Sequence, residues 1–309
     1  MRFATIRWAS LAVGLAIGLS AASPAAVADW RDEIKVFRVG IMTGPNSAYR
    51  MAQLEPFRAY LEAKLAVPVE IFPAQDYRAL IDAQAGSRVH YAVYSATAFS
   101  TAAATCRCVE PIAVPARSGG EVGFYALLVA RADGPIRSLA DAKGARLALA
   151  GADSVAGRLL PIKAFETEGI APAEYFSSVI DNGDPELAIS ALLAGEADLA
   201  VAWSSLAGDS SAGYSFGVLA ALVADGGLSM DQIRVVWQSP LIPFGPHAVR
   251  SDLPDDLKPL LSGALFAMAN ESPAALDAVD RFGGAGLVAA DAGLYAPIEA
   301  LIAPSTPAN

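Results

Sequence analysis

Strand-like and helix-like segments alternate along this chain, and they do so in two separate series. In the first series, β-branched runs and segments with helical spacing of apolar residues alternate at 34–41, 49–65, 67–72, 76–84 and 90–94. The second series repeats the alternation at 145–150, 154–167, 178–180, 185–194 and 198–202. Such alternation is typical of open, mostly parallel sheets flanked by helices.

The two series predict an α/β protein with two lobes and a ligand-binding cleft between them. A strand-like run at 233–237 leads out of the second series, and helix-like segments follow at 253–270 and 274–282. We therefore assign residues 29–125 plus 238–309 to lobe 1 and residues 126–237 to lobe 2. Hinges are expected at 125–131 and 235–239.

The first thirty residues carry the features of an export signal. Arg2 and Arg7 precede an apolar stretch that ends near Ser20, and Ala26-Val27-Ala28 fits the small-x-small cleavage rule. An uncleaved membrane anchor is the weaker alternative, because the apolar run is short for a spanning helix. We therefore expect a signal peptide at 1–28, cleavage near Ala28 and a mature protein in the periplasm.

Composition excludes several classes of protein. Of the 309 residues, 54% are hydrophobic and 17% are charged, which is not the composition of a disordered chain. The sequence pI of about 4.7 argues against a nucleic-acid partner, since phosphate backbones select basic surfaces. Two cysteines cannot staple a chain of this length into a disulfide scaffold. We expect no cofactor.

Polar side chains follow several of the predicted strands, where open α/β sheets place their ligands. They are Asn46 and Tyr49, Tyr94, Ser95 and Thr97, Ser154 at a helix start, Trp203 and Ser204, and Tyr125 at a hinge. Their hydroxyls and amides are suited to bind the oxygen atoms of a small oxyacid. Structural roles remain open for them, such as helix capping by Ser154 and core packing by Trp203.

The only two cysteines are Cys106 and Cys108. In an extended segment their side chains share one side, with Cα atoms roughly 6.5 Å apart, at the upper edge of disulfide geometry. Three interpretations remain open: a strained and reducible local disulfide, two buried thiols, or a thiol ligand for a soft element.

Metal binding and thiol catalysis find little support in the same residues. Two cysteines are too few for a tetrahedral zinc or copper site. His90 and His247 lie far apart in the sequence, and we expect ordinary packing or surface roles for both. A thiol enzyme needs a nucleophile beside an activating base, and the sequence contains no Cys–His–acid signature.

Five short blocks along the chain carry a resemblance to a known family. They are Leu54-x5-Tyr60-Leu61-Glu62, the run 131–144, Asp153-Ser154-x2-Gly157, the run 188–198, and Ser239-Pro240-x2-Pro243. Their order resembles that of type II periplasmic substrate-binding proteins, and more narrowly the phosphate/phosphite/phosphonate-binding family. The resemblance implies two lobes, an oxyanion in the cleft and an ABC permease as partner.

Three departures from the family affect the expected ligand. The family keeps a Ser/Thr-rich anion loop where this chain has Val155 and Ala156 after Ser154. Pro185 stands where the family tends to carry a histidine, and Trp203 where an acidic or polar residue is common. With so few anion donors, the cleft should bind a phosphonate poorly and suit a neutral ligand.

Together with the cysteine pair, these departures make the chain similar to the periplasmic arsenite-binding sensors that regulate arsenite oxidase. Arsenite is mainly an uncharged, sulfur-seeking trihydroxide at neutral pH. The resemblance implies that Cys108 binds arsenic, with Cys106 as second ligand or redox partner, and that lobe closure signals to a membrane histidine kinase. The alternative is the substrate-binding component of an ABC importer for phosphonate, phosphite or a related oxyanion. Neither is an enzyme.

Overall fold

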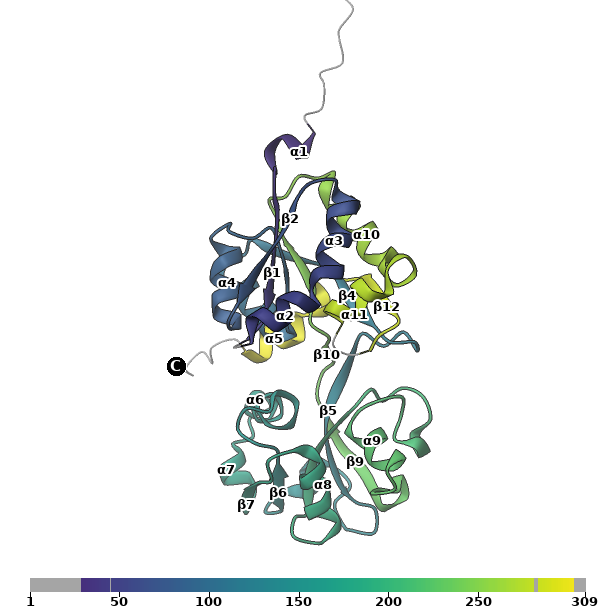
Figure 1. The fold of residues 1–309 in the computed structure, drawn as a ribbon. Coiled ribbons are helices and arrows are strands. Elements are labelled where there is room, and N and C mark those ends of the chain that lie inside the picture. The colour runs from purple at the N-terminus through teal and green to yellow at the C-terminus, as the bar shows by residue number, and fades with distance from the viewer. Residues whose placement is uncertain (1–28, 45, 281–282, 303–309) are drawn as a thin grey trace, which may run out of the picture.

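The computed structural model describes residues 29–44, 46–280 and 283–302, and these form two lobes (Figure 1). The first sheet contains, in spatial order, β12 (Gly286–Ala289), β4 (Val109–Ala116), β11 (His247–Arg250), β3 (Tyr91–Val93), β1 (Phe37–Met42) and β2 (Val69–Ala74). The second contains β10 (Ile242–Pro243), β5 (Gly123–Arg131), β8 (Leu199–Ser204), β6 (Arg146–Leu149) and β7 (Ser178–Asp181), and β9 (Ile233–Gln238) pairs with β5. The predicted α/β architecture with two lobes is confirmed. The expected signal peptide at 1–28 lies outside the described residues.

Both sheets are mixed rather than mostly parallel. Parallel pairing joins β1 to β2 and β3, and it joins β6 to β7 and β8. In the first sheet β11 runs antiparallel to β3 and β4, and β12 to β4. In the second, β5 runs antiparallel to β8, β9 and β10. The prediction of mostly parallel sheets is wrong for these strands, because the chain leaves lobe 1 after β4 and returns through β9, β10 and β11.

Helices cover both sheets. In lobe 1 they are α1 (Trp30–Glu33), α2 (Ser47–Gln53), α3 (Glu55–Leu65), α4 (Tyr77–Ala85), α5 (Ala96–Cys106), α10 (Leu257–Glu271) and α11 (Pro273–Val279). In lobe 2 they are α6 (Leu160–Thr167), preceded by one π-turn at Val155–Leu159, α7 (Pro172–Tyr175), α8 (Pro185–Leu193) and α9 (Val218–Ala224). Among the helices of the described ranges, none is both long and apolar enough to cross a membrane.

The sequence pattern explains most of these elements, with some breaks. The predicted helix at 49–65 is divided at Leu54 into α2 and α3. The predicted helix at 154–167 is a π-turn followed by α6. For the helix predicted at 274–282, the structure gives α11 up to Val279, and residues 281–282 lie outside the described residues. Helix α5 and strand β4 were not predicted, nor was the strand character of β5, which was expected as a hinge.

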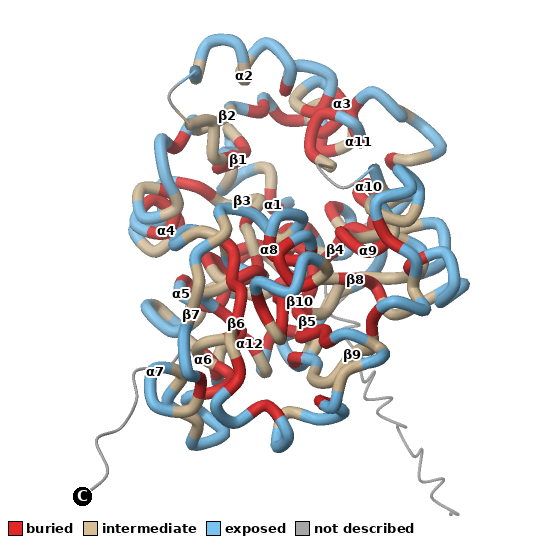
Figure 2. The backbone as a smooth tube through the Cα atoms, turned by 90° about the horizontal axis from the view of Figure 1, so that it is seen from below, coloured by how far each residue is buried: buried red, intermediate tan, exposed pale blue. Residues whose placement is uncertain are grey.

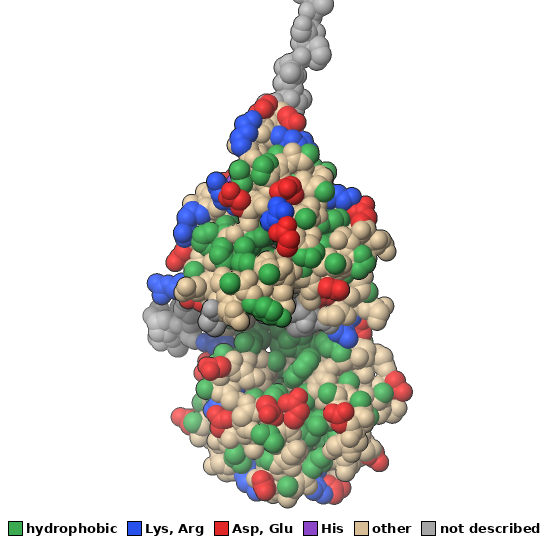
Figure 3. All heavy atoms as spheres, in the orientation of Figure 1, with side chains coloured by type: hydrophobic (Ala, Val, Ile, Leu, Met, Phe, Trp, Pro, Cys, Tyr) green, Lys and Arg blue, Asp and Glu red, His purple; other side chains and the backbone are tan. Residues whose placement is uncertain are grey.

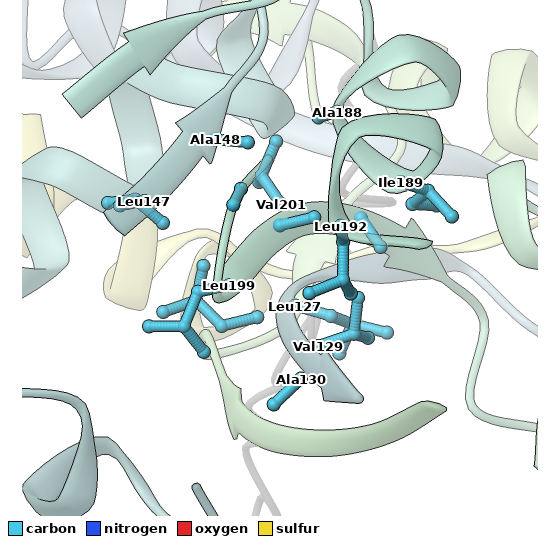
Figure 4. Packing of buried hydrophobic residues seen from close by; sticks show 14 of the residues in the cluster. Leu127, Val129, Ala130, Leu147, Ala148, Ala188, Ile189, Leu192, Leu199 and Val201 are labelled. Atoms are coloured by element: carbon cyan, nitrogen blue, oxygen red, sulfur yellow. The ribbon is translucent and has the colours of Figure 1, made fainter. Parts of the chain in front are cut away.

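Each lobe has its own apolar core. In lobe 2, side chains from β5, β6, β8 and α8 interlock, among them Leu127, Leu147, Leu199 and Leu192, all fully buried (Figure 4). Figure 2 shows β5, β6 and β8 mostly buried and the surrounding loops exposed. The two cores are separate, so that each lobe is a packed unit of its own.

The last described helix, α12 (Ala296–Ile302), packs against both lobes. Ile298 and Leu301 are buried against Leu160 and Ala164 of α6 in lobe 2. The same helix packs beside α5 of lobe 1, where it is the yellow helix beneath α5 in Figure 1. The C-terminal segment that we assigned to lobe 1 therefore contacts both lobes.

Candidate functional site

A cavity of about 390 Å³ lies between the lobes and is lined by residues of both. Lobe 1 contributes Tyr94, Thr97 and His247, and Val155 of the π-turn comes from lobe 2. Phe124 also belongs with lobe 2, because β5 pairs in the second sheet, although residue 124 falls within the range predicted for lobe 1. Figure 3 shows apolar side chains gathered in the hollow between the two lobes. The cavity is therefore where a small molecule would contact both halves of the protein.

The start of α5 supplies polar groups to this cavity. Ser95 is the N-cap of α5, and its Oγ accepts a hydrogen bond from the Ala98 amide at 3.2 Å. The Thr97 hydroxyl lies 3.3 Å from the Ser95 hydroxyl. Because β3 ends at Val93, these residues occupy the carboxyl edge of a parallel strand, as predicted. The first-turn amides of α5 give this edge a partial positive charge.

Two residues that line the cavity each carry a buried polar atom without a hydrogen-bond partner among the described residues. These atoms are the Tyr94 hydroxyl, in a side chain that is 4% exposed, and Nε2 of the fully buried His247. Desolvation lowers the pKa of His247 to about 3 and raises the pKa of Tyr94. Both side chains are therefore uncharged at neutral pH.

Lobe 2 presents an apolar side chain where its helix begins. Ser154 caps the π-turn, and its Oγ accepts from the Gly157 amide at 3.1 Å. Val155 is 40% exposed and lines the cavity. The structure therefore gives Ser154 the capping role that the sequence left open, and its role in ligand binding stays a prediction.

The other predicted residues of lobe 2 lie around the cavity or at the hinge. Trp203 packs edge-on against Phe124, with ring centroids 5.3 Å apart. Ser204 is fully buried, and its hydroxyl is 3.4 Å from the Phe216 carbonyl. Tyr125 borders a separate hollow of about 500 Å³ beside the hinge. The structure thus makes Trp203 a support for the cavity wall.

Asn46 and Tyr49 lie at the beginning of α2, away from the lining of the cavity. Asn46 is the N-cap residue and is exposed, without a side-chain capping bond. Tyr49 is 64% exposed. A ligand contact for either residue stays a prediction.

The cysteines lie far from the cleft. Cys106 ends α5, so it is about 15 Å along the helix from Ala96, at roughly 1.5 Å per residue. Arg107 has a left-handed backbone (φ 52°) that turns the chain back, and Cys106 and Cys108 form a disulfide with Cα atoms 5.1 Å apart. The predictions of an extended segment and of a cysteine thiol in the cleft are wrong, because α5 continues to Cys106 and carries the pair to its outer end.

Sequence reasoning missed the aromatic wall and the buried histidine. Phe124 and Phe244 pack with ring centroids 6.1 Å apart, and both line the cavity. His247 begins β11, a short strand that no local pattern indicated. Within the described part of the chain, no group of three or more His, Cys, Asp or Glu side chains could hold a metal ion.

Comparisons with known proteins identify relatives of this chain. The model of the family described as "ABC transporter, phosphonate, periplasmic substrate-binding protein" matches residues 40–295. The phosphonates-binding periplasmic protein of Escherichia coli (strain K12) is 26% identical over 232 residues, which cover 74% of this chain and 64% of that protein. The match thus spans less than two thirds of the length of this relative.

Solved structures show the same fold. The protein XAC2383 from Xanthomonas citri, bound to ATP, has a TM-score of 0.58 at 21% identity and covers 86% of this chain and 98% of its own. PhnD1 from Prochlorococcus marinus, in complex with methylphosphonate, has a TM-score of 0.52 at 16% identity, with 86% and 97% covered. At these identities the likeness concerns the fold alone.

Proposed function

Because this chain belongs to the phosphonate-type periplasmic substrate-binding proteins of ABC transporters, we propose that it captures a small oxyacid between its lobes and delivers it to the membrane permease of an importer. The observation that carries the proposal is the cavity lined jointly by Tyr94 and Thr97 of lobe 1 and Val155 of lobe 2. A ligand that contacts both lobes favours the closed form, since it binds that form better than the open one.

The connections between the lobes suit a hinge motion. The chain crosses through the segments between β4 and β5 and between β9 and β11, while each lobe keeps a separate core. Rigid lobes joined by short segments close by small rotations at those segments. The closed form would then present both lobes together to the permease.

The structure does not support the argument for an arsenite sensor, but arsenite binding can still be tested. That argument required a thiol in the cleft, whereas Cys106 and Cys108 form a disulfide at the outer end of α5. The remaining argument for arsenite is the small number of anion donors, which suits a neutral ligand. No observation favours a histidine kinase over the permease. The relatives are binding proteins, and we propose no catalytic step. We also propose export through residues 1–28, with cleavage near Ala28.

Calorimetric titration of the exported protein with methylphosphonate, phosphite and arsenite tests the proposal. We expect saturable binding of a phosphorus oxyacid, with a decrease in the radius of gyration measured by X-ray scattering. Arsenite is titrated with the cysteines oxidised and reduced. Binding of arsenite alone, lost in Cys108→Ser, would replace the importer with the sensor. Binding without lobe closure would contradict delivery by hinge motion.

A further inference from the structure

We infer that the cavity selects an oxyacid with an apolar, preferably aromatic, substituent and a headgroup carrying at most one negative charge. The headgroup lies in lobe 1 against Tyr94, His247 and the start of α5, and the substituent lies between Phe124 and Val155. This inference rests on the proposed function and names the class of ligand for that same cavity.

The first observation is the pair of unpartnered polar groups in the cavity wall. The Tyr94 hydroxyl and His247 Nε2 are both buried, yet neither finds a hydrogen-bond partner within the described residues. Buried polar atoms are nearly always hydrogen-bonded, and those that are not require an explanation. Both residues line the same cavity, so a ligand oxygen there is the partner that we infer for the two atoms.

The hydrogen bond at Nδ1 of the imidazole determines whether Nε2 of His247 is a donor or an acceptor. Its Nδ1 lies against the hydroxyl of Tyr91, which is fully buried. If the Tyr91 hydroxyl donates to Nδ1, only the Nε2–H is left unpartnered. If Nδ1 donated instead, the phenol hydrogen and the Nε2 lone pair would both be unpartnered. The first arrangement leaves fewer groups unpaired, so His247 presents an N–H donor to a ligand oxygen.

The charges around the cavity limit the charge of the headgroup. None of the described residues that line it is Lys, Arg, Asp or Glu. The positive contribution comes from the start of α5, equivalent to roughly half an elementary charge. A doubly charged headgroup would lose hydration that no cation of the lining replaces, since Arg50 lines only the adjoining hollow that shares Tyr94 with the cavity. A singly charged or neutral oxygen-rich head matches the donors that are present.

The remaining wall fits an apolar body. Phe124 is held by Trp203 on one side and by Phe244 on another, with centroid distances of 5.3 and 6.1 Å. Val155 contributes an exposed apolar side chain from the start of the lobe 2 helix. An aromatic substituent can pack edge-on against such rings. The substituent then links Phe124 and Val155 to the headgroup site across the cleft.

Three probes measured by calorimetry on the exported protein test the ligand class. Phenylphosphonate and methylphosphonate share a headgroup and differ in the apolar body, while the monomethyl ester of phenylphosphonate carries a single charge. We expect phenylphosphonate to bind at least tenfold tighter than methylphosphonate, and the ester to bind at least as tightly as phenylphosphonate. Equal or tighter binding of methylphosphonate would overturn the apolar body. Loss of binding in the ester would overturn the limit on charge.

Variants locate the two parts of the ligand. Tyr94→Phe should weaken phenylphosphonate binding five- to tenfold, whereas Tyr60→Phe removes a buried hydroxyl that donates to Ala264 O, far from the cavity, and should leave affinity unchanged. Val155→Thr keeps the shape and adds a hydroxyl, so it should reduce the preference for phenyl over methyl severalfold.

The outcomes separate this inference from the proposed function. Wild-type affinity in Tyr94→Phe would overturn the headgroup site. An unchanged phenyl preference in Val155→Thr would overturn the position of the substituent. Binding of inorganic phosphate and methylphosphonate with lobe closure, and none of phenylphosphonate, would overturn the inference and keep the proposed function. Absence of closure with every phosphorus oxyacid would overturn both.

Discussion

Lowering the pH from 7.5 to 5.5 should destabilise lobe 1 through His247. This side chain is fully buried, and desolvation lowers its pKa from 6.5 to about 3. The sequence contains two histidines, and the pKa of the other, His90, is also lowered by burial. The carboxylates with shifted pKa values, such as Asp198, are lowered from 3.8 or 4.5 and are ionised throughout this pH range. The histidines therefore dominate the expected effect.

The sign and size follow from the two pKa values of His247. Between pH 6.5 and about 3, the unfolded chain binds a proton at this imidazole that the folded chain does not. The free energy of unfolding therefore falls as the pH decreases, by about 1.4 kcal/mol for each unit below the unfolded pKa. At pH 5.5 the titration of His247 alone lowers the free energy of unfolding by about 1.4 kcal/mol, whereas at pH 7.5 this reduction is close to zero. His90 acts in the same direction, because its Nδ1 accepts the Arg38 amide and this bond is lost on protonation.

Urea unfolding of the exported protein at pH 7.5, 6.5 and 5.5 measures this effect. In His247→Gln the amide oxygen can still accept from Tyr91, but the group no longer titrates, so the pH dependence should shrink by about 1.4 kcal/mol between pH 7.5 and 5.5. His90→Gln is the matched control and should retain the contribution of His247. An undiminished pH dependence in His247→Gln, or a flat profile in the wild type, would refute the argument.

Three further predictions concern packing and the disulfide. Gly245→Ala places a Cβ against the Tyr94 carbonyl oxygen, so it should lower the free energy of unfolding, measured with urea, by about 1–3 kcal/mol. It should also weaken ligand binding measured by calorimetry. Phe165→Ala removes a fully buried ring from the lobe 2 core and should cost about 3–5 kcal/mol in urea unfolding followed by tryptophan fluorescence; a cost below 1 kcal/mol would contradict the packing. The double variant Cys106→Ser/Cys108→Ser opens a very short loop, so it should lose less than about 2 kcal/mol and bind methylphosphonate unchanged; lost binding would restore the pair to the site.

The sequence predicted those helices in which the spacing of apolar residues and the capping residues indicate the same boundaries. Helix α8 begins at Pro185 after Asp184, whose carboxylate accepts from the Leu187 amide at 2.8 Å. Helix α5 was missed because its run of small residues lacks a clear polar face, and it is stabilised by packing against the sheet and α12. The wrong expectation that Cys106 and Cys108 lie near the cleft followed from missing this helix. An extended segment was expected for the two cysteines, whereas α5 carries them to its outer end.

The candidate site was predicted only in part, for a topological reason. Tyr94, Ser95 and Thr97 follow a parallel strand, and the strand-end rule applies to them. Phe124 and His247 lie on strands that begin where the chain crosses between the lobes and run antiparallel to their neighbours. Their nearness depends on pairing between segments more than a hundred residues apart, which leaves no local pattern in the sequence.

The division of the cavity into a polar half and an apolar half has a consequence for lobe closure. A ligand closes the lobes only by the difference in its affinity for the closed and open forms. Among the described residues that line the cavity, the hydrogen-bonding side chains belong to lobe 1, so we expect a small polar anion to gain little from closure. Burying about 100 Å² of apolar surface against Phe124 and Val155 would favour the closed form by roughly 2.5 kcal/mol. For the ligand class inferred above, we therefore predict that the substituent, rather than the headgroup, drives closure of the lobes.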